Sequence, residues 1–267
     1  MDAATGAATP VMGLLRAGLR LLALAVCLPP LTVLLGLVNL VALVAPGPGR
    51  WLIDVAVRLW TRTLLTIFGV RIHSVGKPPT PPFFLVANHL SYLDILVLYA
   101  HLRARFLSKA EVAGWPGLGL VTRWAGTLYI DRERRRDLSR VLPEIEANLA
   151  SGRGVVVFPE GTSSKGAEVQ RFKPSIFEVP IRTGTPVSYA ALSYRTPVQA
   201  PPAHLSVCWW GDQPFFPHFL ALLKLPRIDS TVAFGQDSLT AEDRKDLALL
   251  AQRAVESKFT PVVGCEV

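Results

Sequence analysis

The chain has 267 residues, of which 50% are hydrophobic, and its mean hydropathy of +0.35 is high for a freely soluble enzyme. The formal charge is +8 and most of the basic residues are arginine, whose planar guanidinium suits phosphates, carboxylates and anionic membrane surfaces. Zinc-ligand spacings, RNA-binding aromatic signatures and basic heptad helices are all missing from the sequence, so nucleic acid is not expected as a partner.

The amino-terminal region carries a long uncharged run from Leu21 to Pro46. One helix of that length would extend about 39 Å, which exceeds the hydrocarbon thickness of a bilayer. Pro29-Pro30 interrupts the run, and a proline inside a helix costs about 3 kcal/mol. Two interpretations follow: a single span, or two shorter helices that meet at the proline pair and form a hairpin in one leaflet. The run is too long for a simple secretory signal.

Arginines lie on both sides of this run, Arg16 and Arg20 before it and Arg50, Arg58 and Arg62 after it. That distribution does not orient a single span, and it fits a hairpin that enters and leaves from the cytoplasmic face. We therefore expect the protein at the inner (cytoplasmic) membrane, with its catalytic domain on the cytoplasmic side.

The next stretch, residues 51–69, is predicted to form an amphipathic helix. Asp54, Arg58 and Arg62 recur every four residues and make one polar stripe, and the other face is almost wholly apolar. This helix either packs on the catalytic domain or lies in the membrane interface. Residues 1–69 are thus predicted to be a membrane-associated helical segment, and residues 70–267 the catalytic domain.

From residue 70 onward, short runs of β-type residues alternate with helical patterns, which predicts an α/β fold with a mixed sheet flanked by helices. A Thr240-x-x-Asp243 capping box favours a start for the last helix near residue 241. The expected strands are 70–75, 83–88, 127–131, 154–160, 187–194, 204–210 and 231–234, and the expected helices are 92–103, 117–125, 136–150, 174–183, 216–224 and 241–258.

The stretch "LVANHLSYLD" places His89 and Asp94 where a predicted strand gives way to a helix. Ser91 and Asp94 have the spacing of a capping box, so Asp94 has a structural role available to it. Within one regular helix, residues five apart lie about 140° apart around the axis and do not meet. If His89 instead lies in the turn before the helix, the Asp94 carboxylate can reach one imidazole nitrogen and leave the other to accept a proton.

A second polar segment follows the buried run "VVVF" as "PEGTSSKG". Pro159 ends the predicted strand, and Glu160, Gly161 and Thr162 begin a loop at its carboxyl end, where α/β proteins bind ligands. Gly161 permits a close backbone approach, and its N–H with that of Thr162 could hold an anion. An ordinary strand-to-loop turn is the alternative for this segment taken alone.

Together, "NHLSYLD" and "FPEGTS" resemble the first and third sequence blocks of the glycerolipid acyltransferase superfamily, typified by 1-acylglycerol-3-phosphate acyltransferase. The segments between and after them, "SKAEVAGWPGLG", "GTLYIDRER", "RFKPSIFEVP" and "GTPV", are similar to the family's other blocks and occur in the same order. The resemblance covers residues from about 70 to 235.

The resemblance implies that His89 deprotonates an acceptor hydroxyl, which attacks the thioester of acyl-CoA or acyl-carrier protein, and that Asp94 orients His89. It also implies an acceptor site around Glu160, Gly161 and Thr162, with Lys109 and Arg132 as contacts for phosphate or carrier. Acyl-CoA or acyl-carrier protein serves as a co-substrate, so no cofactor and no metal are expected. The implied partners are this donor and membrane lipids, and no obligate protein partner is predicted.

One departure from the family pattern bears on the acceptor. The family usually has an arginine after Phe-Pro-Glu-Gly-Thr, and that arginine is taken to hold the acceptor phosphate. Here Ser163 occupies the position and Lys165 follows two residues later. This change, with "WWGDQPFFPHF", resembles the subgroup that acylates lyso-ornithine lipid. The expected acceptor is 1-acylglycerol-3-phosphate, giving phosphatidic acid, and lyso-ornithine lipid or another lysolipid is the alternative.

Three other classes of protein fit the sequence less well. A serine hydrolase would use Ser91 or Ser164, but the chain has no Gly-x-Ser-x-Gly motif. A metallohydrolase would need a second ligand histidine at useful spacing. A non-catalytic membrane adaptor would account for residues 1–70 but not for the polar blocks.

Overall fold

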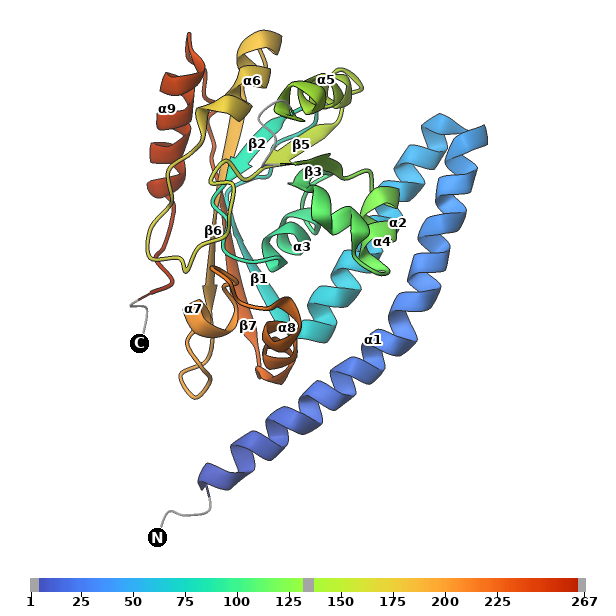
Figure 1. Cartoon of the computed structure of the whole chain (residues 1–267), viewed down its shortest axis with the longest axis vertical. Helices are drawn as coiled ribbons and strands as arrows, with labels where there is room; N and C mark the ends of the chain where they lie inside the picture. Colours follow the sequence, from blue (N-terminus) through green and yellow to red (C-terminus); the bar gives the residue numbers. More distant parts are fainter. Residues whose placement is uncertain (1–4, 132–136, 264–267) are drawn as a thin grey trace.

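A computed structural model describes residues 5–131 and 137–263. Two helices precede a seven-stranded sheet with helices on both faces (Figure 1). The helices are α1 (Thr5–Val44), α2 (Pro46–Phe68), α3 (Leu93–Tyr99), α4 (Leu118–Trp124), α5 (Asp137–Ala150), α6 (Glu178–Thr183), α7 (Ala203–Ser206), α8 (Phe215–Lys224) and α9 (Arg244–Glu256), with 3₁₀ helices η1 (Ala110–Gly114) and η2 (Pro174–Phe177). The strands are β1 (Val70–Val75), β2 (Phe84–Ala87), β3 (Ala104–Lys109), β4 (Leu128–Ile130), β5 (Gly154–Val157), β6 (Val187–Arg195) and β7 (Ile228–Phe234).

The sheet has the strand order β1-β7-β6-β2-β5-β3-β4. Strands β6, β2, β5, β3 and β4 run parallel to one another, and β7 is antiparallel to β6. Because β1 pairs with β7 in parallel, the sheet is mixed, as the sequence predicts. The parallel arrangement brings the carboxyl ends of β2 and β5 to the same edge.

The central strand β2 shows how the two faces of the sheet are covered. All four of its residues are fully buried, as expected of a parallel strand with helices on both sides. Leu85 and Ala87 pack in a core with residues of α2, α3 and α8, whereas Phe84 and Val86 pack with α5 and α9. The residues that follow β2 therefore leave a central strand that is packed on both faces.

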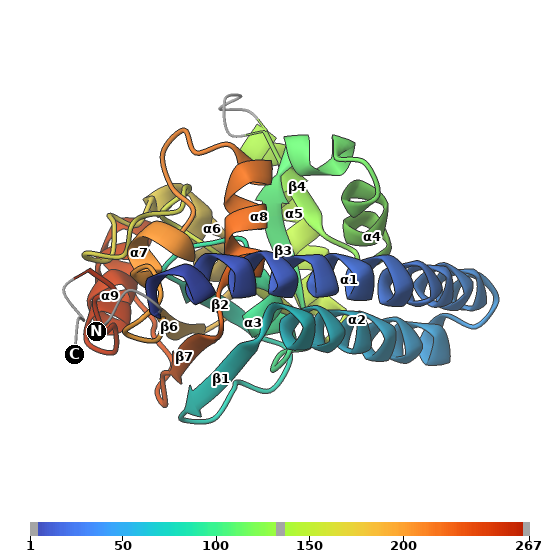
Figure 2. The same ribbon diagram turned by 90° about the horizontal axis from the view of Figure 1, so that it is seen from below.

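Helix α1 is continuous through Pro29-Pro30 and ends at Val44, so the chain does not turn at the proline pair. Of the two interpretations of the amino-terminal run, the structure has the single helix followed by the amphipathic helix. The segment Val11–Val44 is long and apolar enough to cross a membrane. The reversal comes after Val44, and α2 runs back along α1 (Figures 1 and 2).

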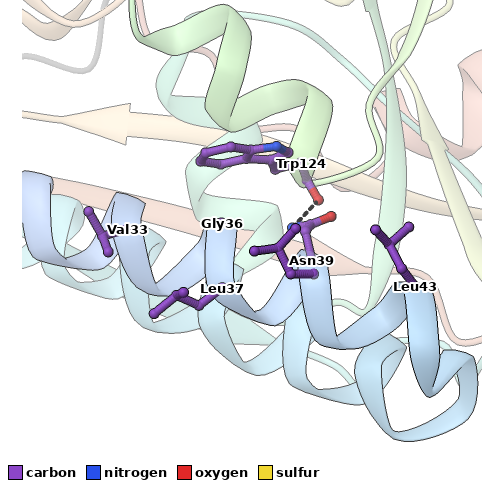
Figure 3. A pocket seen from close by; sticks show the side chains of 7 residues that line it. Val33, Gly36, Leu37, Asn39, Leu43 and Trp124 are labelled. Atoms are coloured by element: carbon purple, nitrogen blue, oxygen red, sulfur yellow. Dashed lines mark hydrogen bonds between the residues drawn. The ribbon is translucent and has the colours of Figure 1, made fainter.

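Polar contacts join α1 to the catalytic domain near the middle of the helix and near its carboxyl end. Arg20 Nη1 donates to the carbonyls of Leu223 and Leu225, 3.0 and 2.8 Å away, at the end of α8. Asn39 Nδ2 donates to the carbonyl of Trp124, 3.3 Å away, at the end of α4. Beside that bond, Trp124 lies over Gly36 in an apolar groove of about 560 Å³ (Figure 3). Helix α1 therefore lies across the domain and does not project from it.

Several predicted elements differ from the structure. The predicted strand 204–210 is wrong: these residues form most of α7 and a loop, and Pro202 is the N-cap of the helix. Strand β3 was not expected. Helix α9 begins at Arg244, because Asp243 itself caps it by accepting the N–H groups of Lys245 and Asp246, so the capping box at Thr240 is also wrong.

Candidate active site

The catalytic histidine candidate lies in the turn between β2 and α3, as the sequence requires for contact with Asp94. Asn88, at the end of β2, continues the sheet with its side chain: Nδ2 donates to the Leu192 carbonyl at 3.0 Å and Oδ1 accepts the Leu192 N–H at 2.7 Å. This pair of bonds joins the end of β2 to β6 and fixes the point from which His89 leaves the sheet.

His89 and Asp94 are in contact, with His89 Nδ1 2.7 Å from Asp94 Oδ2. The same oxygen accepts the backbone N–H groups of Leu90, at 2.6 Å, and Ser91, at 2.9 Å, and the other carboxylate oxygen accepts the Tyr194 hydroxyl at 2.6 Å. These donors stabilise a fully buried carboxylate. An ionised carboxylate only accepts hydrogen bonds, so it fixes the imidazole proton on Nδ1 and leaves Nε2 able to accept a proton.

The predicted capping box is present only in part. Asp94 accepts the Ser91 N–H, as its acidic member should, but α3 begins at Leu93 with Tyr92 as its N-cap. The Asp94 side chain therefore closes the turn that contains His89 as well as orienting the imidazole.

The loop after β5 supports the His89 turn. Glu160 Oε1 accepts the His89 N–H at 3.2 Å, and the Ser164 N–H donates to the His89 carbonyl at 3.0 Å. The imidazole stacks on Phe158, with ring centroids 4.2 Å apart and planes 15° apart. The His89 side chain is 16% exposed, so the contacts with Asp94 and Phe158 leave part of the imidazole accessible.

Glu160 is 4% exposed, and burial raises the pKa of its carboxyl from 4.5 to about 8. Hydrogen bonds from the backbone N–H groups of His89 and Gln170 oppose this rise, and the negative charge of Asp94 adds to it. At neutral pH Glu160 is thus mostly a neutral acid that contacts the backbone of the His89 turn, and it positions that turn.

The remaining residues of this loop have distinct surroundings. Gly161 has φ of 77°, which favours glycine, and its N–H donates to the Phe158 carbonyl at 3.1 Å, so this N–H is engaged within its own loop. Thr162 and Lys165 are exposed. Ser163 Oγ donates to the Trp209 carbonyl, and the Trp209 N–H donates to Leu90, which joins the loop at 209 to both halves of the site.

The other predicted contacts lie farther out. Lys109 is exposed at the carboxyl end of β3, which is the same edge of the sheet as the site. Arg132 lies outside the described residues. The structure thus brings His89, Asp94 and Glu160 into one bonded cluster, with Gly161, Ser163 and Lys165 on the adjoining loop.

Two residues of the site were missed from the sequence. Tyr194 reads there as an ordinary strand residue, and its contact with Asp94 spans 100 positions. Lys173 appears in the sequence only as part of a segment similar to a family block. In the structure its ammonium group lies directly over Gly161: a side-chain Cβ built on Gly161 would be 2.5 Å from Lys173 Nζ. The sequence did contain one signal for this contact, Gly161, because a glycine permits another group to lie close to the backbone.

The serines that a hydrolase would use are not arranged as nucleophiles. Ser91 is fully buried, and the Ser164 hydroxyl accepts the Gly166 N–H at 3.3 Å. Within residues 5–131 and 137–263, neither hydroxyl contacts a histidine.

Comparisons with known proteins agree with this geometry. Residues 69–192 match the family model described as Acyltransferase. The lyso-ornithine lipid O-acyltransferase of Rhodobacter capsulatus is 32% identical, over 73% of this chain and 72% of that protein, and the one of Brucella abortus is 34% identical, over 73% and 78%. The 1-acyl-sn-glycerol-3-phosphate acyltransferase of Neisseria gonorrhoeae is 37% identical over 45% of this chain and 48% of that protein.

The fold has a counterpart among solved structures. The chain superposes on the 1-acyl-sn-glycerophosphate acyltransferase PlsC of Thermotoga maritima with a TM-score of 0.65, at 19% identity, over 93% of this chain and 97% of the other. The likeness includes the amino-terminal helices, since the match extends over nearly the whole of both chains.

Proposed function

This chain belongs to the glycerolipid acyltransferase superfamily, and from that premise we propose that it transfers a fatty acyl group to the free hydroxyl of a lysolipid with His89 as general base. The observation that carries the mechanism is the buried Asp94 carboxylate, which holds the His89 imidazole through Nδ1 while the ring stays accessible on one side. Acyl-CoA or acyl-carrier protein is the proposed donor.

The reaction follows from this arrangement. His89 Nε2 takes the proton of the acceptor hydroxyl as its oxygen bonds to the thioester carbonyl carbon. Asp94 stabilises the imidazolium that forms. The tetrahedral intermediate then breaks its carbon–sulfur bond, and the thiolate leaves with the proton from the imidazolium. Both substrates bind together, so proximity supplies part of the acceleration and no acyl-enzyme is needed.

We propose lyso-ornithine lipid as the first acceptor to test and 1-acylglycerol-3-phosphate as the second. The relatives that match over about three quarters of their length bear the first name, and those that match over about half bear the second. Ser163 supports the same order, because its hydroxyl is bonded to the Trp209 carbonyl and it supplies no charge for a phosphate. Lys165 and Lys173 are exposed cations beside it that suit the carboxylate of an ornithine headgroup or a phosphate.

The test is acyl transfer by the purified full-length protein, with each acceptor offered alongside each donor. His89→Ala should lower the rate by roughly 10²–10⁴, the usual contribution of a general base. His73→Ala, which removes an exposed imidazole from β1, is the control and should keep full activity. Undiminished transfer by His89→Ala would exclude this mechanism, and thioester hydrolysis without transfer to either acceptor would favour a hydrolase.

We also propose that the protein works on the cytoplasmic face of the inner membrane. The support for the membrane is the outward side of α1, where large apolar side chains are exposed between Val11 and Val44, among them Leu15, Leu22, Val33 and Leu40. The support for the cytoplasmic face is the set of arginines on both sides of the uncharged run. A lipid-facing helix bound to the catalytic domain would hold that domain at the surface from which a lysolipid arrives.

A further inference from the structure

A group of arginines lies at the edge of the sheet opposite the catalytic pair. Arg103 immediately precedes β3, and Arg153 immediately precedes β5. His89 and Glu160, in contrast, follow the carboxyl ends of β2 and β5. Since β2, β5 and β3 are parallel, the two arginines share the amino edge, and the length of the strands separates them from the site.

A cavity of about 260 Å³ opens at this amino edge. One wall comes from α2 and the other from the residues that lead into the strands. Its lining includes Asp54, Pro81, Arg103, Arg105, Gly152 and Arg153. Of the polar stripe that the sequence showed on α2, Asp54 lines this cavity.

Positive charge in this cavity is only partly compensated. Three guanidinium groups line it, and Asp54 is the one carboxylate among the lining residues that the structure describes. Arg105 is buried: its Nη1 donates to the Ala125 carbonyl and lies 4.0 Å from the nearest Asp54 oxygen, which is longer than a hydrogen bond. Asp54 thus offsets the charge of Arg105 only at the distance of a long ion pair, and a bound anion in direct contact with the guanidinium would stabilise it further.

Three further arginines of α2, Arg50, Arg58 and Arg62, add positive charge near these groups. Burial lowers the pKa of Arg58, the nearby charges of Arg103 and Arg62 lower it further, and Asp54 opposes the shift. Burial likewise lowers the pKa of Arg153, together with the charges of Arg105 and Arg50, while Asp54 opposes the shift. The guanidinium groups therefore repel one another, and Asp54 offsets only part of that repulsion.

We propose that this cavity is a second ligand site, separate from the catalytic one, and that it binds a phosphate group. Arginine presents paired N–H donors that match phosphate oxygens, and several such groups converge here. The volume is below that of a typical cofactor pocket, so it accommodates a phosphate or diphosphate group and not a whole nucleotide.

The position of the cavity beside α2 indicates how a phosphate group would reach it. Trp51, Val55 and Leu59 are exposed apolar residues of the same helix that carries Asp54 and Arg58. A membrane surface that meets those apolar residues would bring lipid phosphates close to the cavity. A soluble diphosphate would reach it from water by the same electrostatic attraction, and the two sources are separated by experiment.

The test uses the full-length protein in a neutral detergent, with binding of inorganic pyrophosphate measured by calorimetry and binding to phosphatidylcholine vesicles measured with and without phosphatidic acid. Arg103→Gln with Arg153→Gln should weaken anion binding by about tenfold or more, since each change removes a charge-assisted hydrogen bond. Asp54→Asn should strengthen it, because it removes the negative charge from the lining.

Arg253→Gln is the matched control. It removes the same charge from an exposed position on α9, on the other side of the molecule from α2 (Figure 1), and should change neither measurement. A loss confined to phosphatidic acid vesicles assigns the site to lipid phosphate, and a loss with pyrophosphate as well assigns it to phosphate in general. Unchanged binding by the double variant, or weaker binding by Asp54→Asn, would overturn the proposal.

Discussion

At the residue scale, Tyr194 is the least expected member of the site, because it contacts no reacting atom and acts only through Asp94. Among the residues that the structure describes, its hydroxyl is the one side-chain donor to the carboxylate oxygen that faces away from His89. Burial and the charge of Asp94 raise the pKa of Tyr194 well above its ordinary value, so it stays a donor at every working pH. We therefore assign it as a positioning residue.

Tyr194→Phe should lower kcat by about tenfold with little change in KM, since a hydrogen bond to a charged group is worth roughly 1.5–3 kcal/mol. Tyr189→Phe, on the same strand, is the control for loss of a hydroxyl. A fall in kcat of the same size in Tyr189→Phe, or a rise in KM that accounts for the loss, would contradict the positioning role of Tyr194.

Glu160 makes the stability of the fold depend on pH. Its pKa is about 8 in the folded protein and near 4.5 when exposed, so the folded state holds a proton that the unfolded chain releases. The stabilisation from this proton is full below about 4.5 and is lost as the pH rises through about 8. Glu160→Gln should remove that decline in melting temperature, and Glu168→Gln, exposed on the same loop, should preserve it. Parallel melting curves for Glu160→Gln and the parent would contradict the assignment.

At the scale of elements, the sequence predicted regular structure best where periodicity was undisturbed. Strand β1 was predicted over its full length, and α4, α5 and α8 were predicted to within a residue or two. Strand β3 was missed because the predicted helix continued to residue 103 and no glycine or proline marks the boundary with Ala104. The strand forms because its residues fill the space between β5 and β4, which is a tertiary effect.

The same limit applies to the site. The sequence could place His89 and Asp94 together, because five residues and a capping pattern constrain them locally. It could not predict that Glu160 would bond the backbone of His89, or that Asn88 would pair with β6, since both contacts depend on which strands become neighbours. The residue types in the sequence predicted a general base with its orienting carboxylate, and the order of the strands determined which other residues contact them.

At the scale of the whole molecule, the main feature is the apolar surface of α1 that remains exposed in the folded chain. The helix buries Ala17, Leu24 and Leu35 against the domain and exposes apolar side chains on the opposite side. Its bonds to α8 and α4 hold its other side on the domain, so the apolar side stays turned outward.

Leu22→Glu with Val26→Glu should therefore move the protein from the membrane to the soluble fraction. Each change removes an exposed apolar side chain whose burial in lipid is worth roughly 1.5–3 kcal/mol, so the partition coefficient should fall by at least about tenfold. The measurement is sedimentation with membranes after lysis. Leu249→Glu with Leu250→Glu, exposed on α9, is the control and should sediment like the parent protein. Sedimentation of the α1 variant with the membranes would refute this role for α1.

The bonds that connect β2 to β6 also bear on synthesis of the chain. A ribosome delivers α1 and α2 first, the His89 turn next, and β6 about a hundred residues after that turn. Until β6 emerges, Asn88 has no Leu192 to pair with and Asp94 has no Tyr194. The apolar helix α1 is therefore synthesised well before the contacts that complete the catalytic site can form.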